Sequence, residues 1–243
     1  MKKPVADIHT HSIASGHAFG TIREMAMEAS EEGLRILGVS EHAPGIPGTV
    51  DPIYFSNLRM APRELYGVRM LYGAEVNILN SGTLSLEYKY MDHLDYVIAG
   101  IHSQCYADQG KELNTQNVIS CMMGKRVAFI SHPDDDHTPL NYELLVSAAK
   151  EYHVALEVNN SSLIKQDQRM NCVENYRKML KLCRKYEVPV LVSSDAHDPF
   201  YVGKFDLAME LLQGAGFDEE LILNLDENRL LDFIRSHKAG GMN

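Results

Sequence analysis

The stretch VADIHTH (5–11) joins a short apolar run to two histidines at its end. The apolar residues predict a buried strand, and alternate residues of a strand point to the same side, so that His9 and His11 are placed to bind one metal ion. Six further apolar runs end in polar or ligand-type residues in the same way: RILGVSEH (35–42), MLYGAEVN (70–77), DYVIAGIH (95–102), VAFISHP (127–133), VALEVNN (154–160) and VPVLVSSDAH (188–197). Their near-continuous Val, Ile and Leu content is typical of parallel strands wrapped by helices, so the sequence predicts an α/β barrel.

Helical patterns separate these runs, and two have clear boundary residues. The segment Thr21-Ile22-Arg23-Glu24 has the form of a capping box, and its helix is expected to end near Gly33. A second helix is expected over 172–186, with Asn171 as its cap. Two more helices are expected near the end of the chain, in LAMELLQGAG (207–216) and ENRLLDFIRSHK (227–238), before a frayed tail at 239–243.

The connection from Ala43 to Pro62 is rich in proline and glycine, which makes regular structure improbable over most of it. Because it follows His42 at the expected catalytic face, two readings stay open. It is either a lid in which Tyr54 and Phe55 contact substrate, or a covering loop whose aromatic residues pack on the barrel rim.

Composition limits the classes of function. With 243 residues, 45% of them hydrophobic, and no repeat or linker, the chain is expected to form one domain over 1–243. A net charge of −10 disfavours stable binding to nucleic acid or to an anionic membrane. The sequence shows no apolar run of signal-peptide or membrane-spanning length, and its four cysteines have no CxxC spacing, which together favour reduced thiols and a cytoplasmic protein.

Nine side chains of metal-binding type lie at or just beyond the ends of the expected strands: His9, His11, His17, His42, Glu75, His102, His132, Asp195 and His197. Parallel strands bring their C-terminal ends to one face, so these residues are expected to meet there. One histidine at a strand end is weak support for a metal site, and the recurrence is what carries the prediction. Seven imidazoles and two carboxylates are too many for one ion with an open position, but they suit two or three ions and a bridging carboxylate.

Such a centre favours chemistry on phosphate esters. Divalent ions outweigh the charge of two carboxylates, so a phosphate dianion is drawn into the site. A bound water becomes hydroxide near neutral pH, and the ions neutralise the charge that develops on the phosphoryl oxygens, so no Ser or Cys nucleophile is required.

The ordered motifs HTH, SEH, GAE, GIH, SHP and SDAH resemble the PHP family, named for polymerase and histidinol phosphatase, and in particular its stand-alone YcdX-like phosphatase branch. The resemblance covers nearly the full chain. It implies a distorted (β/α)7 barrel, similar to a TIM barrel, with a centre of three divalent metal ions, usually zinc, at the C-terminal face of the strands. Imidazole-rich ligation agrees with zinc and tolerates manganese or iron.

The family pattern also implies how the ligands divide among the ions. His9, His11, Glu75 and Asp195 hold the first ion, and Glu75 bridges to a second. His102 and His132 complete the second site. The third ion is held by His17, His42 and His197. Glu75 and Asp195 are thus catalytic as metal ligands, and no separate general acid is identified.

Substrate contacts are expected from polar residues near the strand ends. Asn159 and Asn160 follow the sixth strand, which carries no ligand, and Ser103 lies beside His102. Arg169 and Lys165 follow the sixth strand and are placed to meet a phosphate or a leaving group. The loop DPFYVG (198–203) is a further wall candidate.

Other polar residues have structural readings. His93, His153 and His237 are expected on the surface or in helices. Asp134 to Asp136 either orient His132 or form an acidic turn that caps the next helix. Ser40, Glu41 and Ser194 flank ligands, and they either hold them by hydrogen bonds or complete turns.

The function predicted from these residues is a metal-dependent phosphatase that hydrolyses a small phosphomonoester through metal-activated hydroxide. One alternative is a phosphodiesterase or 3′ to 5′ exonuclease, which the acidic charge disfavours. An amidohydrolase would have eight strands and often a bridging lysine at a strand end, and a metal or phosphate sensor without turnover is also open. Histidinol phosphate is a candidate substrate by family analogy, and the sequence leaves the oligomeric state open.

Overall fold

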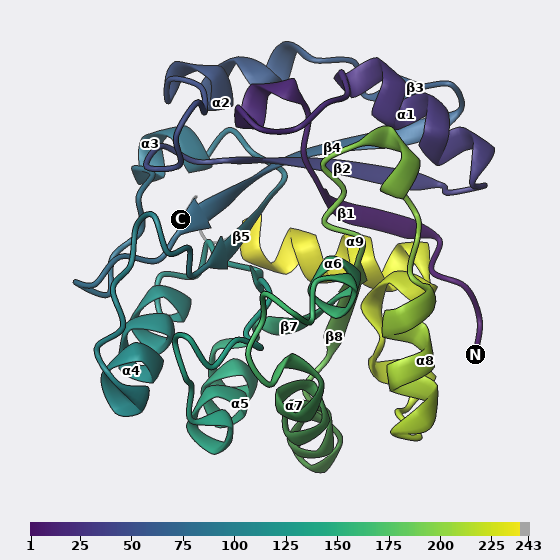
Figure 1. Ribbon diagram of the computed structural model, residues 1–243. Coiled ribbons are helices and arrows are strands. Elements are labelled where there is room, and N and C mark those ends of the chain that lie inside the picture. Colours follow the sequence, from purple (N-terminus) through teal and green to yellow (C-terminus); the bar gives the residue numbers. More distant parts are fainter. Residues whose placement is uncertain (239–243) are drawn as a thin grey trace.

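The computed structural model describes residues 1–238 and contains a nearly closed ring of parallel strands (Figure 1). The strands follow one another in the order β1 (Ala6–Thr10), β2 (Ile36–His42), β4 (Val68–Asn77), β5 (Tyr96–Gly100), β6 (Phe129–Ile130), β7 (Ala155–Asn159) and β8 (Val190–Ser193). Each neighbouring pair is parallel, and a bridge between Thr10 and Ala196 joins the end of β1 to the segment after β8. The predicted seven-strand barrel is confirmed. A two-residue strand, β3 (Glu64–Leu65), adds an antiparallel pair to β4 that the sequence did not indicate.

Helices cover the outside of the ring. The longer ones are α1 (Ile22–Glu31), α4 (Lys111–Met122), α5 (Tyr142–Tyr152), α7 (Cys172–Tyr186), α8 (Asp206–Gly214) and α9 (Glu227–Lys238). The short ones are α2 (Ile53–Asn57), α3 (Tyr88–Met91) and α6 (Asn160–Ile164). Single 3₁₀ turns occur at η1 (Ile13–Ser15), η2 (Leu58–Met60), η3 (Pro199–Tyr201), η4 (Glu219–Leu221) and η5 (Leu223–Leu225). In Figure 1, α4, α5, α7 and α8 lie outside the strands, whereas α9 crosses the middle of the ring in that view.

The structure confirms the predicted start and end of α1 and the predicted range of α7, but not the predicted cap of α7. The Thr21–Glu24 capping box forms at the start of α1, and Gly33 follows its end with a φ of 73°. The predicted helix over 172–186 is α7. Asn171 does not cap it: its φ of 59° is left-handed, whereas an N-cap needs an extended backbone, and its side chain bonds Asp136 instead, at 2.8 Å.

Apolar side chains fill the inside of the barrel at the N-terminal ends of the strands. One apolar cluster contains the first residues of β1, β2, β5, β6 and β7, together with Leu230, Phe233 and Ile234 of α9. Tyr96 crosses this interior and donates a hydrogen bond from its hydroxyl to the carbonyl of Ile8, at 2.6 Å. Because α9 closes this end, the opposite, C-terminal end is where a site can be open to substrate.

Two expectations about individual segments change. The connection after His42 contains α2 and η2, and Phe55 is fully buried in the main core, so the packing alternative holds for Phe55 and a substrate contact does not. His237 lies in a helix as expected but is buried there and stacks on His153 with ring centroids 5.6 Å apart. The predicted tail at 239–243 lies outside the described residues. Among residues 1–238, no helix has the length and apolarity needed to cross a membrane.

Candidate metal centre

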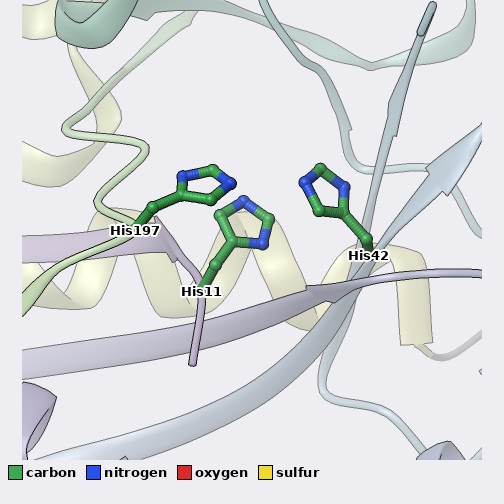
Figure 2. Close-up of side chains that lie close together, drawn as sticks. All are labelled: His11, His42 and His197. Atoms are coloured by element: carbon green, nitrogen blue, oxygen red, sulfur yellow. The ribbon is translucent and has the colours of Figure 1, made fainter. Parts of the chain in front are cut away.

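The nine predicted ligands meet at the C-terminal ends of the strands. His9 lies in β1, and His11 directly follows it. His42 ends β2, and Glu75 lies in β4, two residues before its last residue, Asn77. His102 and His132 come two residues after β5 and β6, and Asp195 and His197 follow β8. Figure 2 shows the rings of His11, His42 and His197 gathered on the same side of the strands. The prediction that these side chains would meet at one face agrees with this geometry.

Glu75 stands at the centre of the group. Its Oε2 lies 3.0 Å from His42 Nδ1, 3.3 Å from His9 Nε2 and 3.5 Å from His11 Nε2. Its other oxygen, Oε1, lies 2.8 Å from His132 Nε2 and 3.3 Å from His102 Nε2. The carboxylate therefore faces two sets of imidazoles with its two oxygens, as a bridging ligand does.

Asp195 forms a second centre of contacts. Its Oδ1 lies 3.2 Å from His11 Nε2, 3.6 Å from His9 Nε2 and 3.5 Å from His197 Nδ1. His17 joins from the loop before α1, with its Nε2 3.1 Å from His197 Nε2. The chain thus brings together all nine residues, although His17 is more exposed than the other eight.

The donor atoms fit divalent metal ions. Buried atoms without a hydrogen-bond partner include His9 Nε2, His11 Nε2, His42 Nδ1, Glu75 Oε2, His102 Nε2 and Asp195 Oδ1. Leaving such atoms unpaired costs about 1–3 kcal/mol each, which an ion bound among them would offset. Two ligands about 2.0–2.1 Å from one tetrahedral ion lie roughly 3.3 Å apart, which is close to the separations around Glu75 and Asp195.

In three of the rings, hydrogen bonds select which nitrogen is free. Glu157 Oε1 binds His9 Nδ1 at 2.5 Å, and Ser15 Oγ binds His11 Nδ1 at 3.1 Å. The carbonyl of Asp195 accepts from His197 Nδ1 at 3.0 Å. In each case Nε2 is left to face the other ligands, because one nitrogen of a neutral imidazole donates while the other can bind metal.

Electrostatics keep most of the donors in their metal-binding forms. Burial lowers the pKa of His11 well below its usual range, and His42 and His197 lower it further. Burial also lowers the pKa of His102 to about 4, although Glu75 opposes this. Metal binding requires neutral imidazoles, so these rings are ready to act as ligands.

The carboxylates show the complementary effect. Burial alone would raise the pKa values of Glu75 and Asp195, but His9 and the other nearby imidazoles hold both well below the usual range. His9 differs from its neighbours: burial lowers its pKa, but Glu157, Glu75 and Asp195 raise it to well above the usual range. A metal ion bound at His9 Nε2 would therefore take the place of a proton.

Glu157 is the main residue that the sequence analysis missed. It is fully buried in β7, and besides His9 it binds the backbone N–H of His132 at 2.6 Å and the amide of Asn159 at 3.1 Å. Glu41 has a similar place in β2, where it accepts hydrogen bonds from Ser12 and Ser15. The available signal was a charged residue inside an apolar run, as in VALEVNN.

Backbone geometry at two ligands is unusual. His132 has a φ of 31° and Asp195 a φ of 53°, in the left-handed region that costs energy for most side chains. Beside them, a Cβ on Gly100 would lie only 3.0 Å from the His132 ring and 3.2 Å from Glu75 Oε1. Glycine is needed there because the ligands approach the backbone closely.

A cavity of about 360 Å³ opens next to His102 and His132, and Ser103, Lys165 and Arg169 line it. Ser103 and Arg169 thus stand where the sequence placed substrate contacts. Arg169 is held by Asp134 Oδ1 at 3.3 Å. Asp134 is buried and does not cap the next helix, which Asn141 caps.

The two asparagines differ from each other. Asn160 lines a second cavity beside Asp195. Asn159 was expected to contact substrate, but it is fully buried, and its amide donates to Glu157 and to Asp195, each at 3.1 Å. Its side-chain oxygen accepts from the N–H of Ser162, so Asn159 has no polar atom left for a substrate, and that expectation is wrong.

A family model described as the PHP domain matches residues 7–208. This chain belongs to the PHP family. A curated relative from Clostridium novyi, named a probable phosphatase, is 40% identical over 235 residues, which cover 96% of each chain. A probable phosphatase of Syntrophotalea carbinolica is 39% identical over 233 residues, again covering 96% of each chain.

Solved structures share the fold of this PHP protein. Histidinol phosphate phosphatase from Lactococcus lactis, solved with zinc, L-histidinol and phosphate, superposes with a TM-score of 0.60 at 17% identity, covering 88% of this chain and 95% of its own. A chain of archaeal ribonuclease P with mature tRNA gives a TM-score of 0.56 at 15% identity, covering 96% and 89%. The predicted family and barrel are confirmed, and the names of the curated relatives agree with the predicted class of enzyme, a phosphatase.

Proposed function

We propose that this PHP protein is a metal-dependent phosphatase that hydrolyses a small phosphomonoester at a centre of three divalent ions. The observation that carries the proposal is the convergence of buried imidazole and carboxylate atoms that have no hydrogen-bond partner. The predominance of imidazole ligands favours zinc. The relatives named probable phosphatases and the zinc-containing histidinol phosphate phosphatase support the same assignment.

We assign the ligands to three groups. His9, His11, Glu75 and Asp195 would hold the first ion. His102 and His132 would hold the second together with Glu75, whose Oε1 faces both rings. His17, His42 and His197 would hold the third. His42 lies between groups, because its Nδ1 is 3.0 Å from Glu75 Oε2 while its ring stacks on His11 with centroids 4.2 Å apart.

The ions would supply a water nucleophile that is active near neutral pH and positive charge that binds the phosphoryl oxygens. The chain's own residues have three tasks. Glu157, Ser15 and the Asp195 carbonyl hold the imidazoles in the required tautomers. Arg169 and Ser103 line the cavity beside His102, where they are placed to bind polar groups of the ester. No side chain near the centre is assigned as the acid for the leaving group, so we expect water to protonate it.

The test combines metal analysis with two substrates. We expect two to three ions per chain, turnover of p-nitrophenyl phosphate that is lost on chelation and returns with metal, and much slower turnover of bis-p-nitrophenyl phosphate. His132→Ala should lose metal and activity, whereas His93→Ala, at an exposed histidine outside the centre, should keep both. Preference for the diester would replace the proposal with a phosphodiesterase. Bound metal without either activity would favour a sensor, and a chain that binds no metal would contradict the proposal.

A further inference from the structure

A second cavity, of about 220 Å³, opens directly beside the proposed metal centre. The ligands Asp195 and His197 form part of its lining, and Phe19, Ile164 and Tyr201 stand around them. Lys165 lines both this cavity and the larger one beside His102, so the two spaces meet near its side chain. A molecule in the second cavity would therefore touch the ligand residues themselves.

Three of the side chains around this cavity are largely apolar and unusually exposed. Phe19 is 77% exposed, Ile164 50% and Tyr201 45%. Exposed apolar surface is unfavourable in water, and a cluster of such residues on one rim marks a binding site more often than isolated ones do. Here the clustered residues line a cavity and do not form a flat patch.

The apolar residues are tied to the ligand segments. The backbone N–H of Phe19 donates to the carbonyl of His197 at 2.7 Å. Tyr201 belongs to η3, which follows His197 directly, and Ile164 ends α6, which follows β7. The distance between this rim and the metal centre is thus set by short segments of chain.

Most polar groups around the cavity are already bonded. Asp198 accepts from the N–H of Phe200 at 3.0 Å, and Asn160 Oδ1 accepts from the N–H of Ala208 at 3.0 Å. Lys204 pairs with Glu32. Among residues 1–238, Lys165 has no ion-pair partner, and it stands where the two cavities meet. The cavity therefore offers an apolar surface with few free polar groups.

We propose that this cavity binds the leaving group of the substrate and that this group is aromatic, held between Phe19 and Tyr201. The inference rests on the proposed phosphatase function, because the scissile phosphate must lie at the metal centre for its ester group to reach the cavity. A flat ring fits because aromatic side chains gain from offset or edge-to-face contact with another ring. Lys165 would lie near the ester oxygen, between the two cavities.

The test compares two esters of primary alcohols, ethyl phosphate and 2-phenylethyl phosphate, which differ in the aromatic ring and share the same type of leaving oxygen. We expect kcat/KM to be at least about tenfold higher for the phenylethyl ester. Phe19→Ala and Tyr201→Ala should each reduce this ratio severalfold. Tyr88→Ala, at a similarly exposed aromatic residue outside the cavity, should leave it unchanged. Equal kcat/KM values, or a preference that survives both substitutions, would overturn the proposal.

A binding measurement separates this inference from the phosphatase function. Saturation-transfer NMR on the protein as purified, without chelation, should detect 2-phenylethanol bound to the wild type and not to Phe19→Ala. Hydrolysis of both esters without binding or preference would refute the aromatic cavity while leaving the phosphatase intact. If neither these esters nor p-nitrophenyl phosphate is hydrolysed, the phosphatase function fails, and absence of 2-phenylethanol binding would then also exclude the aromatic cavity.

Discussion

A buried carboxylate that is not itself among the proposed ligands supports two of the histidines of this centre. Glu157 binds the ring of His9 through one oxygen and the backbone of His132 through the other. These two histidines belong to different proposed metal groups. A carboxylate that orients imidazoles in this way typically raises metal affinity, because it removes the rotation and the wrong tautomer.

Glu157→Gln tests this role at the residue scale. The amide keeps the volume of the side chain but cannot accept hydrogen bonds with both terminal atoms, so we expect metal affinity to fall about 10- to 100-fold. Competition with a chromogenic chelator measures it, with Glu151→Gln, at an exposed glutamate of α5, as the control. Unchanged affinity in Glu157→Gln would show that His9 and His132 are held by their own packing.

At this scale the sequence was a good guide to which side chains converge at the strand ends and a poor one to the residues that support them. The ligands stand where apolar runs end, which is a pattern visible in the sequence. Glu157 and Asn159 lie inside or at the edge of one such run, and nothing in the order of residues tells which strand neighbour they will meet.

At the scale of elements, the start of α1 illustrates how local chemistry sets a boundary. Thr21 accepts from the N–H of Glu24 at 3.3 Å, and Glu24 accepts from the N–H of Thr21 at 2.7 Å. The hydrogen bonds from Thr21 lower the pKa of Glu24. Because the folded pKa is lowered, this stabilisation is present above the unfolded pKa and is lost as the pH falls through the folded pKa.

We expect Thr21→Ala to destabilise the protein by about 1 kcal/mol near pH 7, the usual cost of losing an N-cap. Below the folded pKa of Glu24 the deficit should shrink, because the protonated carboxyl then contributes less in the wild type. Urea unfolding of metal-free protein at several pH values measures the difference. A deficit that does not change with pH would mean that the threonine acts without Glu24.

At the start of α7, by contrast, contacts with a distant segment decide the role of a local residue. Its range, first residue included, was predictable from the pattern of apolar residues. The role of Asn171 as its cap was not, because Asn171 bonds to Asp136 in a segment 35 residues earlier. The same holds for the connection after His42, where the burial of Phe55 produces a short helix among prolines and glycines.

At the scale of the whole molecule, the barrel depends on one tyrosine and the glycines that make room for it. A Cβ on Gly73 would lie 2.6 Å from the ring of Tyr96, and a Cβ on Gly38 would meet the Cα of Ile8 at 2.8 Å. Tyr96 comes from β5, Gly73 from β4 and Gly38 from β2, so the fit involves three strands.

Gly73→Ala should therefore destabilise the fold by about 1–3 kcal/mol, as expected for overpacking in a rigid core. Gly214→Ala is the matched control, because no atom lies within 4 Å of its added methyl group at the end of α8. We expect that control to be neutral or to stabilise by up to about 1 kcal/mol. Chemical denaturation measures both, and equal stabilities would contradict the packing of Tyr96.

Whether residues 1–243 form one domain stays a prediction, which a single unfolding transition would support.

The sequence by itself determined the seven strands of the barrel, the α/β type of fold and the proposed ligands, because apolar runs and the polar residues that end them are local properties. Only the tertiary structure decided which carboxylate supports which histidine. It also decided that the side chain of Asn159 makes its hydrogen bonds inside the protein, and that Phe19, Ile164 and Tyr201 share one cavity. Those relations join residues far apart in the chain, and they depend on the register and closure of the barrel. The physical reason is that hydrogen-bond partners and cavity walls are set by distance in space. Spacing along the sequence does not measure that distance directly.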